Sequence, residues 1–184
     1  MHPDRERWNS KFAAGKGGHG ANVRLIMYRD RLSRGRALDV AAGAGENAVI
    51  LALAGWSVVA SDLSDTAIAK ARGRARELKA DLAFVQADAT LLPFRPASFD
   101  TVVCTYFLDR PAARRLPSLL KPGGTLFFMT HRIGHQKYIP DLPAQYCLEA
   151  GEVKTLFPDL KELLHQEDDD GQEDYGLFIG QRKA

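Results

Sequence analysis

Cysteine is scarce in this chain of 184 residues, which contains only two. Cys104 and Cys147 fall on apolar or mixed segments and lack the spacing of metal ligands. Their scarcity argues against a disulfide scaffold and against a zinc site. We expect two free buried thiols in a protein of a reducing compartment.

Long apolar runs are absent from the amino terminus, and an excess of charge is absent from the whole chain. Residues 1–10 are polar and charged, with no stretch typical of a signal peptide or a membrane span. The 25 Lys and Arg residues nearly balance the 23 Asp and Glu residues, so the formal net charge is +2. This balance gives no strong field toward nucleic acid or membrane. We therefore expect a cytoplasmic protein without a nucleic-acid or membrane partner.

Apolar runs alternate with helical patterns from Arg36 onward, and the length suits one compact domain. The runs predict strands over 37–40, 57–61, 82–86, 99–104 and 125–130. Helices are predicted over 47–54, 65–78 and 110–120, with a turn at 121–124. The carboxyl-terminal part of the chain predicts a helix over 149–157, a strand or helix end over 161–165 and a last strand over 175–181. Uniformly apolar strands are typical of a parallel sheet covered on both faces, so the order predicts an α/β sandwich.

A glycine turn follows the first predicted strand. Asp39 is followed by Val-Ala-Ala-Gly-Ala-Gly, and Asn47 opens a helix that is apolar nearly all round. Small residues at the carboxyl end of a strand let a ligand approach the backbone, and the helix start offers unpaired N–H groups. Short Gly-rich turns also serve simply to reverse the chain, so this motif alone leaves both interpretations open.

Two further carboxylates follow predicted strands. Asp62 lies 17 residues beyond Gly45, close to the spacing at which a carboxylate accepts both hydroxyls of a ribose. Asp62 could instead cap the next helix, although Ser64 and Asp65 can also do so. Asp88 follows the third strand, where its carboxylate and a neighbouring N–H could recognise an adenine.

Together these motifs resemble the class I S-adenosylmethionine-dependent methyltransferases. The resemblance covers residues 36–184 and includes Leu-Asp-Val-Ala-Ala-Gly-Ala-Gly at 38–45, Asp62, Asp88, Phe-Asp-Thr-Val-Val at 99–103 and Leu-Lys-Pro-Gly-Gly at 120–124. It implies a three-layer Rossmann-like sandwich with a mostly parallel seven-stranded sheet and an antiparallel last strand. It also implies S-adenosyl-L-methionine as the cofactor and S-adenosyl-L-homocysteine as the product.

The resemblance assigns roles to individual positions. Asp39 would orient the methionine amino group, directly or through water, and the backbone near Cys104 would also receive that group. Asp62 would hold the ribose hydroxyls, and the remaining contacts would come from Ala41, Gly43, Gly45, Leu63, Asp88 and Ala89. Ala41 departs from the family pattern, which usually has glycine there. Alanine is tolerated where the backbone angles are ordinary, so we expect ordinary angles at Ala41.

The amino-terminal segment 1–35 precedes the predicted cofactor domain 36–184. Its aromatic patch, with Trp8 and Phe12, leads into a glycine-rich stretch that contains His19. This arrangement resembles the lid of small methyltransferases similar to the tellurite-resistance and thiol methyltransferases, which covers the cofactor and helps to enclose the substrate. A flexible leader is the alternative.

Candidates for the chemistry follow the fourth and fifth strands. His131 lies at the functional edge of the sheet, and Tyr106 could line a pocket there. The catalytic residues stay unknown, because methyl transfer from a sulfonium needs mainly in-line positioning. His131 and His135 have i, i+4 spacing, but Gly134 interrupts the helix and no third ligand is evident, so we expect no metal.

Three functions are compatible with these features. The first is a methyltransferase for a small-molecule acceptor, acting as a monomer or homodimer. The second is an NAD(P)-dependent oxidoreductase, since Gly43, Gly45 and Ala48 also satisfy the dinucleotide fingerprint, although the order of motifs disfavours it. The third is a non-catalytic protein that binds S-adenosylmethionine.

Overall fold

The computed structural model describes residues 3–18 and 20–184, and every element below lies within these ranges. The strands are β1 (Arg36–Val40), β2 (Ser57–Asp62), β3 (Leu82–Gln86), β4 (Phe99–Thr105), β5 (Leu120–His131), β6 (Lys161–Asp169) and β7 (Asp174–Gln181). The α-helices are α1 (Pro3–Ala13), α2 (Val23–Tyr28), α3 (Glu46–Leu53), α4 (Asp65–Glu77), α5 (Arg110–Leu119) and α6 (Glu152–Thr155). Three short 3₁₀ helices are η1 (Arg29–Arg31), η2 (Ile133–Lys137) and η3 (Ala144–Tyr146).

All seven strands form one sheet in the order β3-β2-β1-β4-β5-β7-β6. The strands β1 to β5 pair in parallel, and β7 runs antiparallel to both β5 and β6. The predicted α/β sandwich with a mostly parallel seven-stranded sheet and an antiparallel last strand is confirmed. The strand order reverses between β1 and β4, and ligands bind beyond the carboxyl ends of the strands at such a point.

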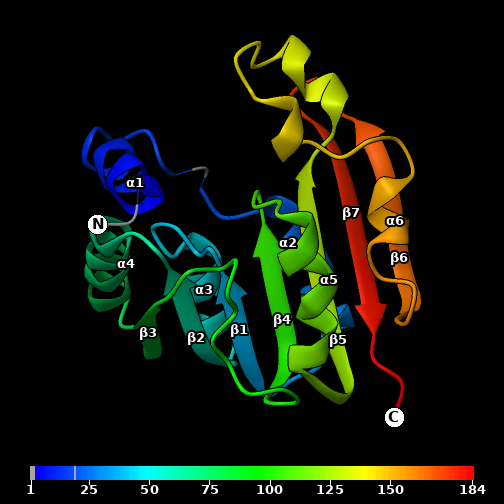
Figure 1. Ribbon diagram of the computed structural model, residues 1–184. Coiled ribbons are helices and arrows are strands. Elements are labelled where there is room, and N and C mark those ends of the chain that lie inside the picture. The colour runs from blue at the N-terminus through cyan, green and yellow to red at the C-terminus, as the bar shows by residue number, and fades with distance from the viewer. Residues whose placement is uncertain (1–2, 19) are drawn as a thin grey trace.

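Helices cover both faces of the sheet, which makes three layers (Figure 1). Leu25 of α2 and Leu51 of α3 pack into the core on one face. Leu116 of α5 and Val153 of α6 pack into the core on the other. Because helices cover both faces, β1, β2 and β4 are buried along nearly their whole length, and the apolar residues at their centres allowed their positions to be predicted.

Several predicted boundaries were wrong. The turn at 121–124 lies inside β5, with Gly123 at φ 76°, so the strand is longer than 125–130. The helix predicted over 149–157 is limited to α6. It begins after Gly151, which has φ 74°, and it ends before Phe157, which precedes a proline. Residues 161–165 belong to a strand, β6, which continues to Asp169.

The segment before β1 is largely helical in the described residues. In Figure 1, α1 lies on α4 at the β3 side of the molecule, and α2 lies over the sheet. Asn22 caps α2, since its side chain accepts a hydrogen bond from the Leu25 N–H. None of the helices within residues 3–18 and 20–184 has the length and apolarity that crossing a membrane requires.

Candidate functional site

The glycine turn between β1 and α3 has an unusual backbone. Ala41, Gly43 and Gly45 have φ values of 53°, 55° and 77°. The expectation of ordinary angles at Ala41 was therefore wrong: the alanine occupies a left-handed conformation that favours glycine. Gly45 is required for packing as well, because a Cβ there would lie 2.7 Å from the Ala71 Cβ of α4.

Asp62, at the end of β2, holds this turn. Its Oδ2 accepts a hydrogen bond from the Gly43 N–H at 2.8 Å, and its Oδ1 accepts one from the Ser64 N–H at 2.8 Å. Burial raises the pKa of the Asp62 carboxyl, and these two N–H donors oppose the rise. The helix cap is Ser64, whose Oγ accepts from the Ala67 N–H, so capping does not explain Asp62. Each carboxylate oxygen keeps acceptor capacity for a further donor.

Asp39, near the end of β1, is a buried acid. Its residue is 1% exposed, and neither carboxylate oxygen has a hydrogen-bond partner of good geometry within the described residues. Burial first, and then the charges of Asp62 and Glu46, raise the pKa of Asp39 to about 8, although the nearby Ala48 amide opposes this rise. An unsatisfied buried carboxyl is costly, so a cationic ligand group beside it would relieve the cost.

The remaining predicted cofactor residues lie on the same edge of the sheet. Cys104 on β4 is opposite Val40 in the register with β1, and its thiol is buried, which raises its pKa. Leu63 directly follows β2, and its carbonyl accepts from the Gln86 side chain. Asp88 follows β3 and accepts from the Thr90 N–H and hydroxyl, and Ala89 beside it is buried.

These residues suit S-adenosylmethionine. The unsatisfied Asp39 carboxyl offers a partner for its ammonium group, and Asp62 offers two oxygens for vicinal hydroxyls. Gly43 carries no side chain between them, and the nearest group on its open side is the Phe12 ring, whose Cζ would lie 3.3 Å from an added Cβ. Asp39, Gly43 and Asp62 therefore lie together beside the reversal of strand order, whereas Asp88 and Ala89 follow β3, two strands away from β1.

The predicted lid residues lie over the glycine turn. The Phe12 ring is buried, and a Cβ added to Gly43 would lie 3.3 Å from its Cζ. Trp8 packs on Phe12, with ring centroids 6.1 Å apart. The helix α1 is held to α4 by Asn9, which accepts from the Ser64 hydroxyl at 2.6 Å. The predicted lid residue His19 lies outside the described residues.

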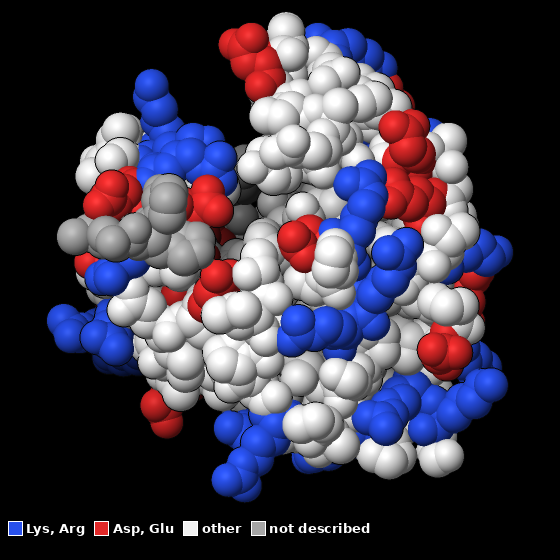
Figure 2. Space-filling view, in the orientation of Figure 1, with Lys and Arg blue, Asp and Glu red and all other residues white. Residues whose placement is uncertain are grey.

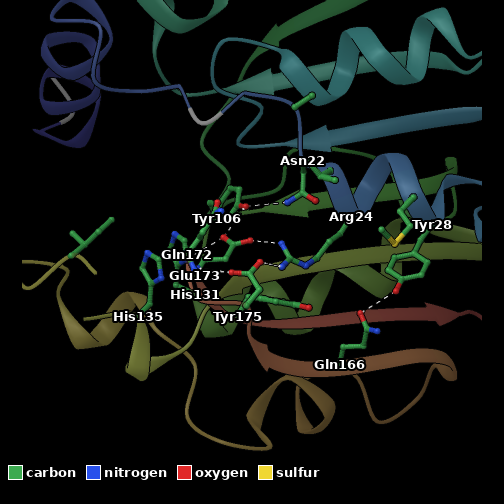
Figure 3. A pocket seen from close by; sticks show the side chains of 15 residues that line it. Asn22, Arg24, Tyr28, Tyr106, His131, His135, Gln166, Gln172, Glu173 and Tyr175 are labelled. Carbon is green, nitrogen blue, oxygen red and sulfur yellow. Dashed lines mark hydrogen bonds and ion pairs between the residues drawn. The ribbon is translucent and has the colours of Figure 1, made fainter. Parts of the chain in front are cut away.

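A separate pocket of about 780 Å³ opens beside this edge (Figure 3). It brings together the two predicted chemical candidates, Tyr106 after β4 and His131 at the end of β5, whose ring centroids are 4.8 Å apart. Tyr106 has φ 56°, a strained conformation for an aromatic residue that is typical of functional sites. In Figure 2 the surface is hollowed between the part formed by α1 and the part formed by residues 133–148.

Four residues of this pocket were not predicted from the sequence to be part of a site. Glu173 accepts a hydrogen bond from the Tyr106 hydroxyl at 3.1 Å, and its Oε2 lies 3.9 Å from His131 Nδ1. Arg24 of α2 pairs with Glu173, and Asn22 donates to the Tyr106 hydroxyl at 3.2 Å. His135 stacks on His131 with ring centroids 3.8 Å apart. Only the i, i+4 spacing of the two histidines signalled any of these contacts.

Two asparagines connect the pocket with the glycine turn. Asn47, near the start of α3, donates to the Thr105 hydroxyl at 2.9 Å and accepts from the Asn22 N–H at 2.8 Å. Thr105 directly precedes Tyr106, which lines the pocket. The Asn47 side chain therefore links α3, the helix that follows Gly45, to the pocket wall. This contact couples the predicted cofactor site to the pocket.

The described part of the chain contains no cluster of three or more His, Cys, Asp or Glu side chains placed to hold a metal ion. The two histidines of the pocket instead stack on each other, with their rings inclined by 6°. The expectation that the protein uses no metal stays a prediction.

Comparison with known proteins adds independent findings. Residues 37–124 match a family model described as a methyltransferase domain. The chain is 42% identical over 96 residues to a demethylmenaquinone methyltransferase of Beutenbergia cavernae, covering 50% of this chain and 38% of that protein. It is 37% identical over 133 residues to a ubiquinone biosynthesis O-methyltransferase of Xanthomonas campestris, covering 67% of this chain and 56% of the relative. The chain thus spans only about two fifths to just over half of these curated relatives.

One similar solved structure is described as "Conversion of a Disulfide Bond into a Thioacetal Group during Echinomycin Biosynthesis". Its TM-score is 0.80 at 21% sequence identity, and the match covers 98% of this chain and 92% of that one. At this identity the likeness shows the shared fold alone.

Proposed function

We propose that the chain, whose residues 37–124 match a methyltransferase domain, is a class I S-adenosylmethionine-dependent methyltransferase that transfers a methyl group to a small-molecule acceptor. The observation that carries the proposal is the pocket of about 780 Å³ lined by Tyr106 and His131, at the carboxyl ends of β4 and β5. Its volume lies within the range of small-molecule sites. The contact from Asn47 to Thr105 puts the two sites next to each other.

The cofactor supplies an electrophilic methyl group on a sulfonium when it is bound. The chain would hold it through Asp39 at the ammonium group and Asp62 at the ribose hydroxyls. The adenine would lie by Asp88 and Ala89, with Leu63 beside it and the Cys104 backbone near the amino group. The support for this assignment is the unsatisfied Asp39 carboxyl and the spare acceptor capacity of Asp62.

The segment 1–35 would act as the lid of the domain 36–184. The buried Phe12 ring already contacts the turn at Gly43, and closure of the segment would exclude water there. Exclusion of water favours methyl transfer, because water solvates the nucleophile and competes for the electrophile. The cytoplasmic location, the absence of a nucleic-acid partner and the monomeric or homodimeric state stay predictions from the sequence.

The names of two relatives support a small acceptor. The Beutenbergia protein is a demethylmenaquinone methyltransferase and the Xanthomonas protein a ubiquinone biosynthesis O-methyltransferase. We propose that the acceptor is a small molecule with an apolar part, since the pocket lining includes the exposed apolar residues Val23, Met27 and Ile139.

Calorimetry and a transfer assay test the proposal. We expect binding of S-adenosylmethionine and S-adenosylhomocysteine but not of NAD, and a reversed preference would favour the oxidoreductase alternative. Transfer of a labelled methyl group would then be measured over phenols, thiols, amines, carboxylates and metalloid oxyanions. Cofactor binding without transfer to any of these would favour the non-catalytic alternative.

A further inference from the structure

We infer that Asn47 is a positioning residue for methyl transfer, which fixes one wall of the pocket relative to the glycine turn through Asn22 and Thr105. The inference rests on the proposed function and deepens it, because it names a residue that the transfer requires in addition to the cofactor contacts. The wall in question, the α2 wall, is formed by residues 21–28. Its members that line the pocket are Ala21, Asn22, Val23, Arg24, Met27 and Tyr28.

The side chain of Asn47 joins three segments of the chain. Asn47 is the second residue of α3, the helix that starts directly after Gly45. Its Oδ1 accepts a hydrogen bond from the Asn22 N–H at 2.8 Å, and its Nδ2 donates to the Thr105 hydroxyl at 2.9 Å. One planar amide therefore holds the start of the α2 wall and the end of β4 against the first turn of α3.

Asn22 extends this connection into the pocket. Its side chain accepts from the Leu25 N–H at 3.0 Å, which caps α2, and donates to the Tyr106 hydroxyl and to Met129 Sδ, each at 3.2 Å. Asn22 and Asn47 are only 4% and 9% exposed. Because both amides are buried, water does not readily replace a partner that is removed, and loss of the Asn47 amide leaves the Asn22 N–H unpaired.

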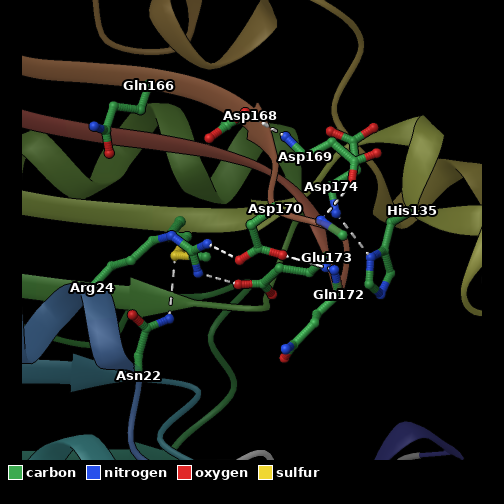
Figure 4. A network of polar contacts seen from close by, with 12 residues as sticks. Asn22, Arg24, His135, Gln166, Asp168, Asp169, Asp170, Gln172, Glu173 and Asp174 are labelled. Carbon is green, nitrogen blue, oxygen red and sulfur yellow. Dashed lines mark hydrogen bonds and ion pairs between the residues drawn. The ribbon is translucent and has the colours of Figure 1, made fainter.

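Arg24 holds the α2 wall to the other side of the pocket. It pairs with Asp170 and Glu173, which lie in the turn between β6 and β7 (Figure 4). Its guanidinium carbon also lies 3.6 Å from the centroid of the Tyr175 ring. These contacts fix the α2 wall to the hairpin of β6 and β7, whereas the contact with Asn47 fixes it to the side of the cofactor.

The geometry of methyl transfer explains why such a connection is needed. The acceptor atom must lie in line with the methyl carbon and the sulfur, and a displacement of about 1 Å costs about 100-fold in rate. The α2 wall would orient the acceptor, while the glycine turn and Asp62 would orient the cofactor. Asn47 fixes these two parts relative to each other, so the rate depends on it although its side chain takes no part in the bond changes.

The first test uses S-adenosylhomocysteine as the probe and needs no acceptor. Hydrogen–deuterium exchange measured by mass spectrometry reports the amides of the α2 wall, including the Asn22 N–H. We expect the bound probe to slow their exchange about tenfold in the wild-type protein, because an ordered glycine turn stabilises the α2 wall through Asn47. Asn47→Leu has a side chain of similar size without the amide. It should bind the probe with a Kd within about twofold of the wild-type value, while the slowing is lost.

The matched control is Val49→Ala, at a residue of the same helix that is 1% exposed. It weakens the packing of α3 but keeps the Asn47 amide, so the slowing should remain. Asn47→Ala removes the same amide without adding bulk and replaces Asn47→Leu if that variant does not fold. Equal slowing in the wild-type protein and in a folded Asn47 variant would overturn the inference, as would bound probe without slowing in the wild-type protein.

The second test measures transfer from S-adenosylmethionine with a labelled methyl group to the panel compound that the wild-type protein methylates fastest. Asn47→Leu should lower kcat/KM about 100-fold, although its Kd for S-adenosylhomocysteine hardly changes. Asn47→Asp should retain more of the rate, because its carboxylate can accept from both the Asn22 N–H and the Thr105 hydroxyl. A merely structural role predicts instead that Val49→Ala loses as much of the rate as Asn47→Leu when the two variants have the same Tm.

The outcomes separate this inference from the proposed function. A folded Asn47→Leu protein with the wild-type kcat/KM would refute the inference and leave the proposed function intact. Failure of the wild-type protein to bind S-adenosylmethionine, or to transfer its methyl group to any compound of the panel, would refute the proposed function and the inference with it.

Discussion

The backbone N–H of Gly43 donates a hydrogen bond to Asp62 Oδ2 at 2.8 Å, which joins the turn after β1 to the carboxylate at the end of β2. Asp39 stands in β1 four residues before Gly43, and its buried carboxyl is close enough to Asp62 for the Asp62 charge to raise the pKa of Asp39. Asp39 and Asp62 thus lie close together at the carboxyl ends of β1 and β2, beside the point where the strand order reverses. A ligand with one cationic group and several hydroxyls would satisfy both.

Asp62→Ala should weaken binding of S-adenosylmethionine. Loss of charge-assisted hydrogen bonds costs about 1–3 kcal/mol, so the Kd should rise roughly 5- to 150-fold. Calorimetry measures the Kd, and circular dichroism checks that the variant is folded. Asp81→Ala is a matched control on an exposed loop before β3. A folded Asp62→Ala protein with the wild-type Kd would show that this carboxylate does not contact the cofactor.

Ala41→Gly should stabilise the protein. Alanine at φ 53° costs about 1 kcal/mol relative to glycine, which adopts this conformation without a Cβ penalty. In a domain of this size the Tm should rise by about 2–4 °C in thermal unfolding. Ala52→Gly, in α3, provides the opposite control and should lower stability by about 1 kcal/mol. A lower Tm for Ala41→Gly would mean that the alanine methyl makes contacts worth more than the strain.

Asp39 should make stability depend on pH. Its pKa is about 8 in the folded chain against 3.8 for an ordinary aspartate side chain, so between these values the unfolded state binds fewer protons. The free energy of unfolding should therefore fall as pH rises from 4 to 8, by up to about 1.4 kcal/mol per unit from this group. Asp39→Asn should remove that part of the slope in urea titrations. Identical slopes for both proteins would contradict the assignment.

Cofactor binding should release a proton from the same carboxyl. The ammonium group of S-adenosylmethionine favours the charged form of Asp39, so binding at pH 7 should release about one proton. Calorimetry in buffers of different ionisation enthalpy measures this number. In Asp39→Asn the release should vanish, and an equal release from both proteins would place the proton elsewhere.

The central strands β1, β2 and β4 were predictable from the sequence because nearly all of their residues are buried, whereas β3 is half-buried or exposed. β3 has the predicted bounds, and β1, β2 and β4 differ by a residue or less at each end. The sequence placed Asp62 correctly at the carboxyl end of a strand, because Asp62 ends β2, while its role toward a cofactor stays a prediction. The left-handed conformation of Ala41 could not be predicted, because an alanine in a sequence does not indicate a positive φ.

The pocket was not predictable for a different reason. Glu173 reaches Tyr106 across 67 positions of sequence, and only the antiparallel register that puts His131 opposite Tyr175 brings the hairpin of β6 and β7 there. The contact of Asn22 with the Tyr106 hydroxyl likewise depends on how α2 packs on the sheet. Tertiary pairing of this kind leaves no local pattern in the chain.

Phe12→Ala should weaken cofactor binding without unfolding the domain. The Phe12 ring covers Gly43, whereas the polar contacts of α1 with α4 come from Asn9 and Arg5 and are retained in the variant. Opening of the lid would admit water to the site, and we expect a Kd for S-adenosylmethionine about tenfold higher, equivalent to about 1.4 kcal/mol. Leu78→Ala, at an exposed residue after α4, is the control for loss of an apolar side chain. An unchanged Kd in a protein with the wild-type Tm would mean that α1 lies near the site without closing it, which would favour the flexible-leader alternative for the segment 1–35.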